Sequence, residues 1–203
     1  LSVRAEKALK DPNYNFKTLE KKNIDKYIKD FTKIYNEAWS KYPGVSKLEL
    51  SQAKLLFSQL KPILDEKILW FAYYNNEPIG FFISIPEMNQ IFKYVNGKLD
   101  LIGKIKTFYH LKIKKSCKKM VGLVFGIVPK HQGKGVDGAL IMASRETIQE
   151  KLGYEDLELN WIPDFNKSMI KVAEQVQVKL GKIHHTYRYN FDRSIPVERI
   201  TKK

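Results

Sequence analysis

The spacing of apolar residues in the first third of the chain predicts two amphipathic helices. In the first, over 24–39, apolar side chains recur every three or four positions, as one face of an α-helix requires: Ile24, Ile28, Phe31, Tyr35, Ala38 and Trp39. The Tyr-Pro-Gly sequence at 42–44 is expected to end it. A second helix is predicted over about 47–60, because Ser46 and Glu49 fit a capping box, in which each side chain binds a free backbone N–H.

Runs of β-branched and aromatic residues predict the strands of a single sheet. Residues 68–75 and 78–85 are apolar almost throughout and are separated by a polar turn, which indicates a hairpin of central strands. Further strands are predicted at 15–19, 120–129, 157–162 and 182–191, with helices after residue 135 and around residues 169–176. This order predicts an α/β fold, a mixed sheet with helices on both faces.

Length and composition indicate one domain. The chain has 203 residues, of which 43% are hydrophobic, and we divide it into a lead-in (1–14), a folded domain (15–191) and a polar tail (192–203). Because the first residue is Leu, a further N-terminal domain is expected in the parent protein. The lone Cys117 excludes an internal disulfide and a Cys-rich metal site, which favours a reducing, cytoplasmic location. No apolar run reaches the length of a membrane span, so no membrane partner is expected.

The net charge of +14 favours an anionic partner, although a lysine-rich protein also gains solubility from such a charge. The charge is concentrated in a segment over 86–119, interpreted as an insertion, which holds nine lysines between Lys93 and Lys119 with four aromatic residues among them. This segment has two interpretations. It is a surface for nucleic acid or another polyanion, or its aromatic residues pack on the domain while its lysines stay in water. We favour the second.

The sequence His131-Gln132-Gly133-Lys134-Gly135, between a predicted strand and a predicted helix, is typical of an anion-binding loop. A helix N-terminus carries unpaired N–H groups and a partial positive charge, and glycine lets the backbone approach an anion closely. The loop is neither a Walker loop nor a dinucleotide fingerprint.

The chain resembles the GNAT superfamily, the Gcn5-related N-acetyltransferases, from about residue 15 to 191. The Val-x-Pro-x-x-(Gln/Arg)-x-x-Gly-x-(Gly/Ala) motif of that family stands here as Val128, Pro129, Gln132 and Gly135, with Asp137 in the last position. The later Asn-x-x-Ala element stands here as Asn166 and Met169. The chain is also similar to a poorly characterised bacterial subgroup with a Gly-Lys-Gly-x-Asp loop, a Trp161-Ile162-x-x-x-Asn166 stretch and a Thr-Tyr-Arg sequence, here 186–188.

The resemblance implies an N-acetyltransferase that uses acetyl-CoA as acyl donor, uses no metal, and acylates an amine of a small molecule or peptide. It places the pyrophosphate of CoA on the loop amides and the pantetheine along the preceding strand. The residues implied in acetyl-CoA binding are Gly126, Ile127, Val128, Gln132, Gly133, Lys134, Gly135, Val136, Asp137, Gly138 and Asn166.

The chain departs from the family pattern at three positions. Asp137 replaces a Gly or Ala beside the pyrophosphate, Ala173 replaces a tyrosine that protonates the leaving thiolate, and Gln177 replaces a glycine that closes the helix. An acidic side chain near a diphosphate weakens its binding unless it instead caps the helix.

Glu158 is a candidate base and Tyr187 a candidate acid, each against a simpler interpretation as a solvated strand carboxylate and a core tyrosine. Two other functions remain open. One is a catalytically degenerate GNAT-like domain that serves as a structural or ligand-binding part of a larger protein. The other is an aminoacyl transferase linked to nucleic acid through the basic segment.

Overall fold

The computed structural model describes residues 3–39, 42, 45–145, 147–148 and 152–196. The helices are α1 (Val3–Lys10), α2 (Ile24–Trp39), α3 (Leu50–Leu60), α4 (Asn89–Phe92), α5 (Leu101–Phe108), α6 (Val136–Arg145) and α7 (Lys167–Gln175). The strands are β1 (Tyr14–Thr18), β2 (Leu69–Tyr74), β3 (Glu77–Pro86), β4 (Lys119–Ile127) and β5 (Asp156–Leu159). Pro43 and Gly44, expected to end the first helix, lie outside the described residues.

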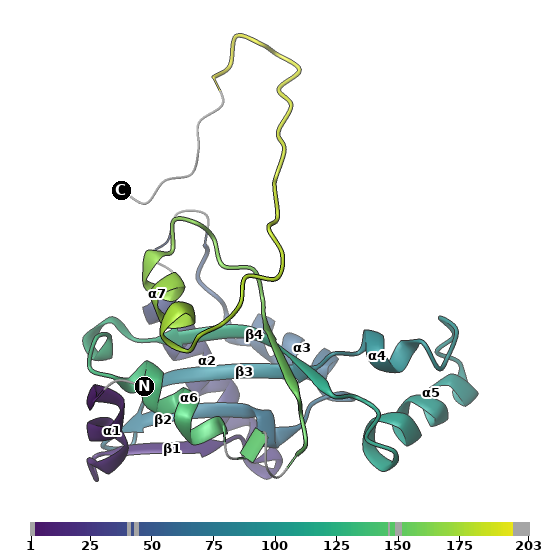
Figure 1. Ribbon diagram of the computed structural model, residues 1–203, viewed down its shortest axis with the longest axis horizontal. Coiled ribbons are helices and arrows are strands. Elements are labelled where there is room, and N and C mark those ends of the chain that lie inside the picture. The colour runs from purple at the N-terminus through teal and green to yellow at the C-terminus, as the bar shows by residue number, and fades with distance from the viewer. Residues whose placement is uncertain (1–2, 40–41, 43–44, 146, 149–151, 197–203) are drawn as a thin grey trace.

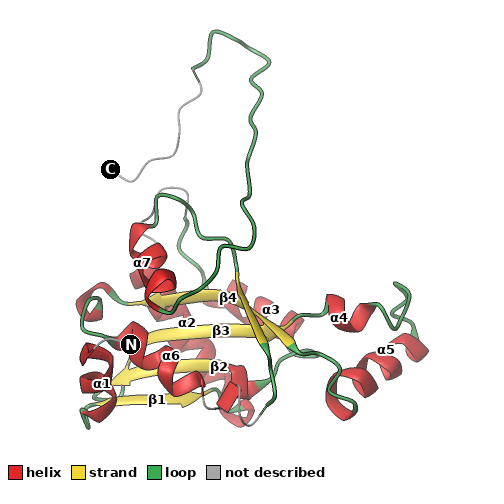
Figure 2. Cartoon of the chain, in the orientation of Figure 1, coloured by secondary structure: helices red, strands yellow, loops and turns green. Residues whose placement is uncertain are grey.

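The five strands form one sheet in the order β1-β2-β3-β4-β5. The first four pair antiparallel, and β5 pairs parallel to β4. Helices cover both faces: α2 packs behind the sheet and α6 in front of it, while α3 packs on α2 and α1 on α6 (Figures 1 and 2). The predicted α/β mixed sheet with helices on both faces is therefore confirmed.

The central hairpin of β2 and β3 forms the core. Phe71 and Phe81 lie opposite each other in the two strands, and their rings meet Tyr27 and Phe31 of α2 at centroid distances of 5.0 and 4.8 Å. The turn consists of two asparagines with φ of 47° and 66°, as the tight turns that suit twisted hairpins require. Because helices cover both faces, these strands are apolar almost throughout, as predicted.

The second predicted helix begins later than its sequence pattern indicated. The capping box of α3 is made by Glu49 and Gln52, not by Ser46 and Glu49. The cause is a tertiary contact, since the Asn36 side chain accepts a hydrogen bond from Leu48 N (2.8 Å) and donates one to Leu48 O (3.0 Å). These bonds hold the preceding residues against α2, so the helix starts after them.

The lead-in segment contains a helix that the sequence analysis did not predict. Helix α1 buries only two small side chains, Ala5 and Ala8, which gives a weak hydrophobic pattern. It packs closely on α6, and it also contacts β1. The boundary between lead-in and domain at residue 14 stays a prediction, but α1 is part of the packed structure.

The strand predicted at 182–191 is wrong. This segment has no strand pairing in the structure and extends away from the domain, as Figure 1 shows. Its apolar side chains are exposed, with Tyr187 at 90% and Phe191 at 95%. Alternation indicates an extended backbone with one apolar side, but a strand also needs a neighbour. Within the described residues the sheet ends at β5, which leaves this segment without one.

No helix in the described part of the chain combines the length and apolarity that crossing a bilayer requires. Among the same residues, no cluster of three or more His, Cys, Asp and Glu side chains is placed to hold a metal ion.

Candidate functional site

The loop between β4 and α6 presents a run of free backbone amides. A short 3-10 turn, η4 (Pro129–His131), follows β4, and the first backbone bond of α6 runs from Ala139 N to Gly135 O at 2.9 Å. The amides of residues 133–138, which we call the amide loop, find no hydrogen-bond acceptor among the described residues. Unpaired amides at a helix N-terminus attract an anion.

The first two glycines of the amide loop, Gly133 and Gly135, are needed for different structural reasons. Both take positive φ, 73° at Gly133 and 85° at Gly135. A Cβ at Gly133 would meet nothing within 4 Å, whereas one at Gly135 would lie 2.4 Å from the backbone of Arg4 in α1. Arg4 Nη1 also donates to Gly133 O at 3.2 Å. Gly133 thus leaves open space for a ligand, and Gly135 allows α1 to pack against the loop.

A β-bulge opens the sheet next to this loop. In the β3–β4 pairing, Ile83 faces Val124 and Ser84 faces Gly122, so Leu123 is an extra residue in β4. Strand β5 pairs with β4 only over 119–122, followed by one bond from Asn160 N to Gly122 O at 2.9 Å. On that side no strand pairs with 123–127 among the described residues, and the bond found there is from the Gln132 side chain to Ile127 O, so β4 offers a largely free edge.

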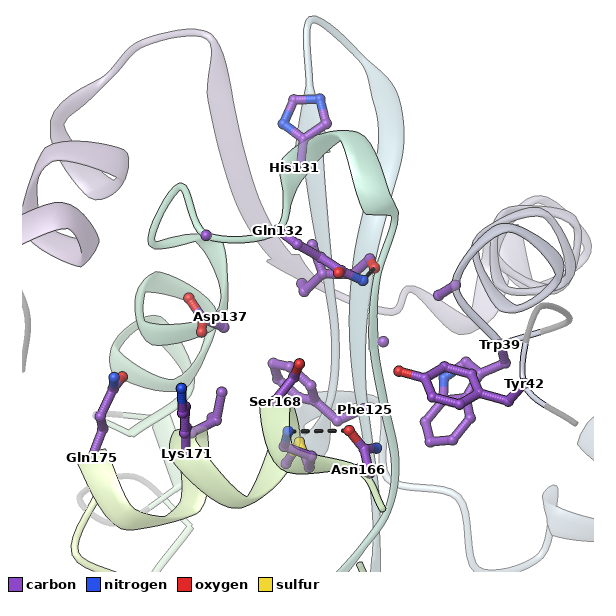
Figure 3. A pocket seen from close by; sticks show the side chains of 16 residues that line it. Trp39, Tyr42, Phe125, His131, Gln132, Asp137, Asn166, Ser168, Lys171 and Gln175 are labelled. Atoms are coloured by element: carbon purple, nitrogen blue, oxygen red, sulfur yellow. Dashed lines mark hydrogen bonds between the residues drawn. The ribbon is translucent and has the colours of Figure 1, made fainter. Parts of the chain in front are cut away.

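A cavity of about 290 Å³ lies between the free edge of β4, the amide loop, the end of α2 and helix α7. Its apolar lining includes Ala38, Trp39, Phe125, Met169 and Val172, and its polar lining includes Tyr42, Gln132, Asp137, Asn166, Ser168, Lys171 and Gln175. Figure 3 shows these side chains arranged around one space. A smaller cavity of about 60 Å³, lined mainly by apolar residues that include Phe82 and Trp161, shares Trp39, Phe125, Asn166 and Met169 with it.

Six of the predicted acetyl-CoA contacts line this cavity: Gly126, Ile127, Gln132, Gly133, Asp137 and Asn166. Two of them also hold the local structure. Gln132 Nε2 donates to Ile127 O at 2.8 Å and so fastens the loop to β4. Asn166 caps α7 by accepting a bond from Met169 N at 3.2 Å.

The other predicted contacts lie close by but do not line the cavity. Val128 is buried, and its amide bonds to Ile79 O at 2.9 Å. Lys134 is exposed on the loop, while the Val136 side chain is buried in the core and only its amide belongs to the amide loop. Gly135 packs on α1, and Gly138 lies half-buried in the first turn of α6.

Asp137 does not cap the helix. No hydrogen bond to its carboxylate is found among the described residues, and its side chain lines the cavity beside the amide loop (Figure 3). A negative charge therefore stands in the same space as the unpaired amides.

The two predicted catalytic residues are not brought to the cavity. Glu158 forms ion pairs with Lys119 and with Lys182 (2.9 Å). These hydrogen bonds, first from Lys119 and then from Lys182, lower the pKa of Glu158 to about 2. Tyr187 lies on the extended segment, 90% exposed. Glu158 and Tyr187 are both absent from the side chains that line the cavity.

Two of the departures from the GNAT pattern lie in or just after helix α7. Gln177 takes φ of 57°, the left-handed conformation for which glycine is favoured, just after the helix ends. Ala173 does not line the cavity. Gln177 therefore adopts, at this helix end, a conformation that a glycine would take more easily.

Sequence reasoning missed most side chains of the cavity, among them Trp39, Tyr42, Ser168 and Lys171. The sequence signal for Trp39 was Gly126, because a glycine inside an apolar strand often marks the close approach of another group. In the structure, a Cβ at Gly126 would lie 3.1 Å from Trp39 Nε1. The tyrosine belongs to the Tyr-Pro-Gly sequence, which was interpreted only as a helix stop. Ser168 and Lys171 had no sequence signal apart from their positions after Asn166.

Two residues with reactive side chains have structural roles. The His131 ring is buried between Tyr14 and Tyr74, and its pKa is lowered by burial and by the nearby Lys134 and Lys130. Cys117 is buried, with its Sγ donating to Lys119 O at 3.0 Å, and burial raises the pKa of its thiol.

Comparison with known proteins shows which fold this is. No family model matches the chain. A bacterial ceramide synthase of Caulobacter vibrioides is 28% identical over 84% of this chain, and protein YghO of Escherichia coli is 21% identical over 76%. The chain spans less than half the length of these curated relatives, 44% and 40% respectively.

Several solved structures that resemble the chain are N-acetyltransferases. An aminoglycoside acetyltransferase from an uncultured soil metagenomic sample aligns over 89% of this chain and 99% of its own, with a TM-score of 0.57 and 12% identity. The ribosomal-protein-S18-alanine N-acetyltransferase of Escherichia coli aligns over 88% of this chain and 86% of its own, with a TM-score of 0.54 and 14% identity. An aminoglycoside acetyltransferase bound to a CoA bisubstrate analogue aligns over 87% of this chain and 98% of its own, with a TM-score of 0.52 and 16% identity.

The opened mixed sheet and the strand–loop–helix with free amides define the α/β domain and its candidate site. The likeness to these structures shows that the chain has the fold of these N-acetyltransferases, which is the fold that the resemblance to the GNAT superfamily implies.

Proposed function

We propose that the chain is the acyl-CoA-dependent N-acyltransferase domain of a longer protein. The observation that carries this proposal is the amide loop: six successive unpaired amides at the N-terminus of α6, beside a cavity and the free edge of β4. A diphosphate needs several N–H donors that converge without intervening side chains. Gly133 meets this need, because a Cβ there would stand in open space.

The free edge of β4 suits the rest of an acyl-CoA molecule. The pantetheine chain carries two amide groups, and a strand edge offers N–H and C=O groups at matching intervals. The bulge at Leu123 exposes this edge, and Gly126 leaves room beside Trp39. The acyl-CoA thioester then belongs in the cavity, between β4 and α7.

In the proposed reaction the acceptor amine attacks the thioester carbonyl directly. A C–N bond forms, the C–S bond breaks, the amine nitrogen loses a proton and the leaving thiolate gains one. The family tyrosine that supplies this proton is absent, since Ala173 stands in its place. The hydroxyls of Tyr42 and Ser168 line the cavity instead (Figure 3) and are the candidates for that role.

Asp137 is expected to weaken acyl-CoA binding without preventing it. Two unit charges about 4 Å apart in water interact by about 1 kcal/mol, and the six amides and the overall charge of +14 act in the opposite direction. Lys171 of α7 also lines the cavity and adds a positive charge to the lining that holds Asp137.

The test is a titration with acetyl-CoA, followed by thermal shift and calorimetry, with two matched glycine variants. Gly133 and Gly97 have the same φ of 73°, and a Cβ at either would meet nothing within 4 Å. Gly133→Ala and Gly97→Ala should therefore lose similar stability, about 1 kcal/mol each. Only Gly133→Ala should weaken acetyl-CoA binding, by about tenfold or more, because only this loop faces the ligand.

The outcomes separate the alternatives. Binding that is lost in Gly133→Ala and kept in Gly97→Ala supports the site, and turnover with an amine then supports the enzyme. Binding without turnover for any amine supports a catalytically degenerate ligand-binding domain. If the wild-type protein shows no stabilisation by acetyl-CoA or a longer acyl-CoA, the proposal is wrong.

A second candidate function differs in the length of the acyl group that is transferred and of the amine that accepts it. The sequence analysis expects an acetyl donor, but the two cavities share a largely apolar lining that includes Trp39, Phe125 and Met169. A relative is named a ceramide synthase, and a ceramide is the amide of a long-chain acid and a long-chain amine. Transfer of a long acyl group, or transfer to a long-chain amine, therefore competes with acetyl transfer. A larger thermal shift with palmitoyl-CoA than with acetyl-CoA, at concentrations below micelle formation, would favour a long-chain donor.

A further inference from the structure

The segment between β3 and β4 is mostly helical and forms an arm. We define the arm as residues 88–116, which contain α4, α5 and a five-residue π-helical turn, Tyr109–Ile113. Helix α5 begins with a proper cap, since Asp100 Oδ1 accepts from Gly103 N at 2.8 Å. Figure 1 shows the arm projecting beyond the end of the sheet, away from the amide loop.

The inner side of the arm already has its own packing. Ile91, Met88 and Cys117 form a small buried cluster, against which Leu111 packs. The rings of Tyr94 and His110 stack in parallel at a centroid distance of 3.8 Å and tie the loop after α4 to the helical segment. The exposed side chains of α5 therefore lie on an outer face that the fold does not use.

This outer face is strongly apolar. Its large side chains recur at the spacing of one helix face and are between 47% and 75% exposed: Leu101, Ile102, Ile105, Phe108, Tyr109 and Ile113. The interpretation favoured from sequence, that the aromatic residues of this segment pack on the domain, is wrong for Phe108 and Tyr109. A contiguous apolar patch on a soluble surface marks an interaction site.

Lysines surround the apolar face. At about 100° per residue, Lys104 and Lys106 fall on opposite flanks of the stripe centred on Leu101 and Ile105. The arm contains seven lysines, all exposed, and its single acid, Asp100, is used as the helix cap. Within the described residues, the ion pair found for an arm lysine is Lys112 to Asp65, at 3.9 Å. The field around the apolar stripe is therefore positive.

We propose that the arm is a membrane-docking surface, which inserts the apolar face of α5 into the interface of an anionic phospholipid bilayer while its lysines contact the headgroups. An amphipathic helix with aliphatic and aromatic residues on one face and lysines on its flanks binds such an interface by burial and by charge together. The lysine stems are long enough to let the apolar side chains sink between them.

A nucleic acid fits the arm less well than a bilayer does. Single strands are held by stacking bases on aromatic rings, and Leu101, Ile102 and Ile105 have no ring to offer. The same three side chains lose most of their contact with water in acyl chains. The absence of a spanning helix among the described residues does not bear on this surface, because the arm would lie on the bilayer and not cross it. The proposal does not depend on the acyl-transfer function.

The test is flotation of the full chain with vesicles of phosphatidylcholine alone and with vesicles that also contain phosphatidylglycerol. The wild-type protein should float only with the anionic vesicles and should be released by salt. Ile105→Glu should lower the affinity by about tenfold or more. Leu180→Glu is the matched control, because Leu180 is also highly exposed (79%) but lies outside the arm, and its affinity should not change.

Two further variants test the parts of the proposal. Lys104→Ser with Lys106→Ser should lower the affinity for anionic vesicles by about tenfold. The arm contains no tryptophan, so Phe108→Trp adds a reporter whose emission should shift to the blue on insertion. Slow labelling of the buried Cys117 by a thiol reagent shows that each variant keeps the arm folded.

Several results would overturn the proposal. One is the absence of binding to anionic vesicles, and another is binding that Ile105→Glu leaves unchanged while Cys117 stays protected, since binding would then be electrostatic only. Arm-dependent binding to single-stranded RNA with no binding to vesicles would assign the surface to nucleic acid instead. An unchanged emission of Phe108→Trp on bound vesicles would exclude insertion of this face.

Discussion

The two ends of β4 present opposite kinds of surface. At its C-terminal end, free main-chain amides border a small cavity, and Gly133 leaves open space beside them. At its N-terminal end, the arm displays large apolar side chains between lysines. Neighbouring free amides suit a compact anion, whereas a broad amphipathic face suits an extended anionic interface. On our two proposals, one strand separates two modes of recognising negative charge.

Both ends rely on a glycine that a neighbouring backbone covers. At Gly135 the covering backbone is that of α1, and at Gly103 it is Lys98, whose carbonyl oxygen would lie 1.9 Å from an added Cβ. The two glycines therefore allow each end to be disturbed separately, and the first two predictions use them.

The largest effect is expected for Gly135→Ala. An added Cβ would lie 2.4 Å from the Arg4 backbone, and the φ of 85° is itself unfavourable for alanine. We expect the free energy of unfolding to fall by about 2–4 kcal/mol and acyl-CoA binding to be lost with it. Urea unfolding followed by circular dichroism measures the first effect. A variant as stable as the wild type would show that α1 does not pack on the loop.

A smaller and more local effect is expected for Gly103→Ala. The added Cβ clashes at the start of α5. This should lower the local stability of the arm by about 1–3 kcal/mol and leave the rest of the domain unchanged. Cys117 should then react faster with a thiol reagent, while the affinity for acyl-CoA stays within about twofold of the wild type. Loss of acyl-CoA binding in this variant would contradict the independence of the two ends of β4.

Asp137→Asn should strengthen acetyl-CoA binding at the amide loop. Removal of one negative charge beside a bound diphosphate is worth about 1 kcal/mol, so acetyl-CoA should bind about fivefold more tightly. Calorimetry at low ionic strength measures the change, and added salt should reduce it. Weaker binding in the variant would show that the carboxylate contacts the ligand favourably.

The smallest effect is expected for Glu158→Gln. The lowered pKa of Glu158, about 2 against 4.5, means that its carboxylate stabilises the folded protein above the unfolded pKa, and this stabilisation is lost as the pH falls toward 2. The melting temperature of the variant should therefore lie slightly below that of the wild type at neutral pH. The difference should disappear at the acid end of the series. Because Glu158 does not line the cavity, turnover should be unaffected, and a large loss of turnover would restore it as a catalytic base.

The sequence predicted what depends on local pattern. The helix at 24–39, the central hairpin and the glycine-containing loop between a strand and a helix each have a periodicity or a turn chemistry that neighbouring elements do not alter. The chain also has the fold of known N-acetyltransferases, as the Val-x-Pro motif implied.

Features that depend on distant contacts could not be predicted in the same way. The start of α3 depends on Asn36, the packing of Gly135 depends on α1, and the cavity depends on Trp39 meeting Gly126. The alternating segment at 182–191 shows the limit most clearly, because alternation gives the backbone shape but not the partner strand. The exposure of Phe108 and Tyr109 likewise follows from where the arm projects, and lysine-rich composition alone does not determine it.

The central claim is that the amides of residues 133–138 bind the diphosphate of an acyl-CoA. A titration of ¹⁵N-labelled protein with acetyl-CoA, followed by amide chemical shifts, tests it most directly. We predict that the largest chemical-shift changes occur at the amides of Gly133 to Gly138, with smaller changes along 123–127 and none in the arm. Saturable binding that leaves the amides of 133–138 unshifted would contradict it.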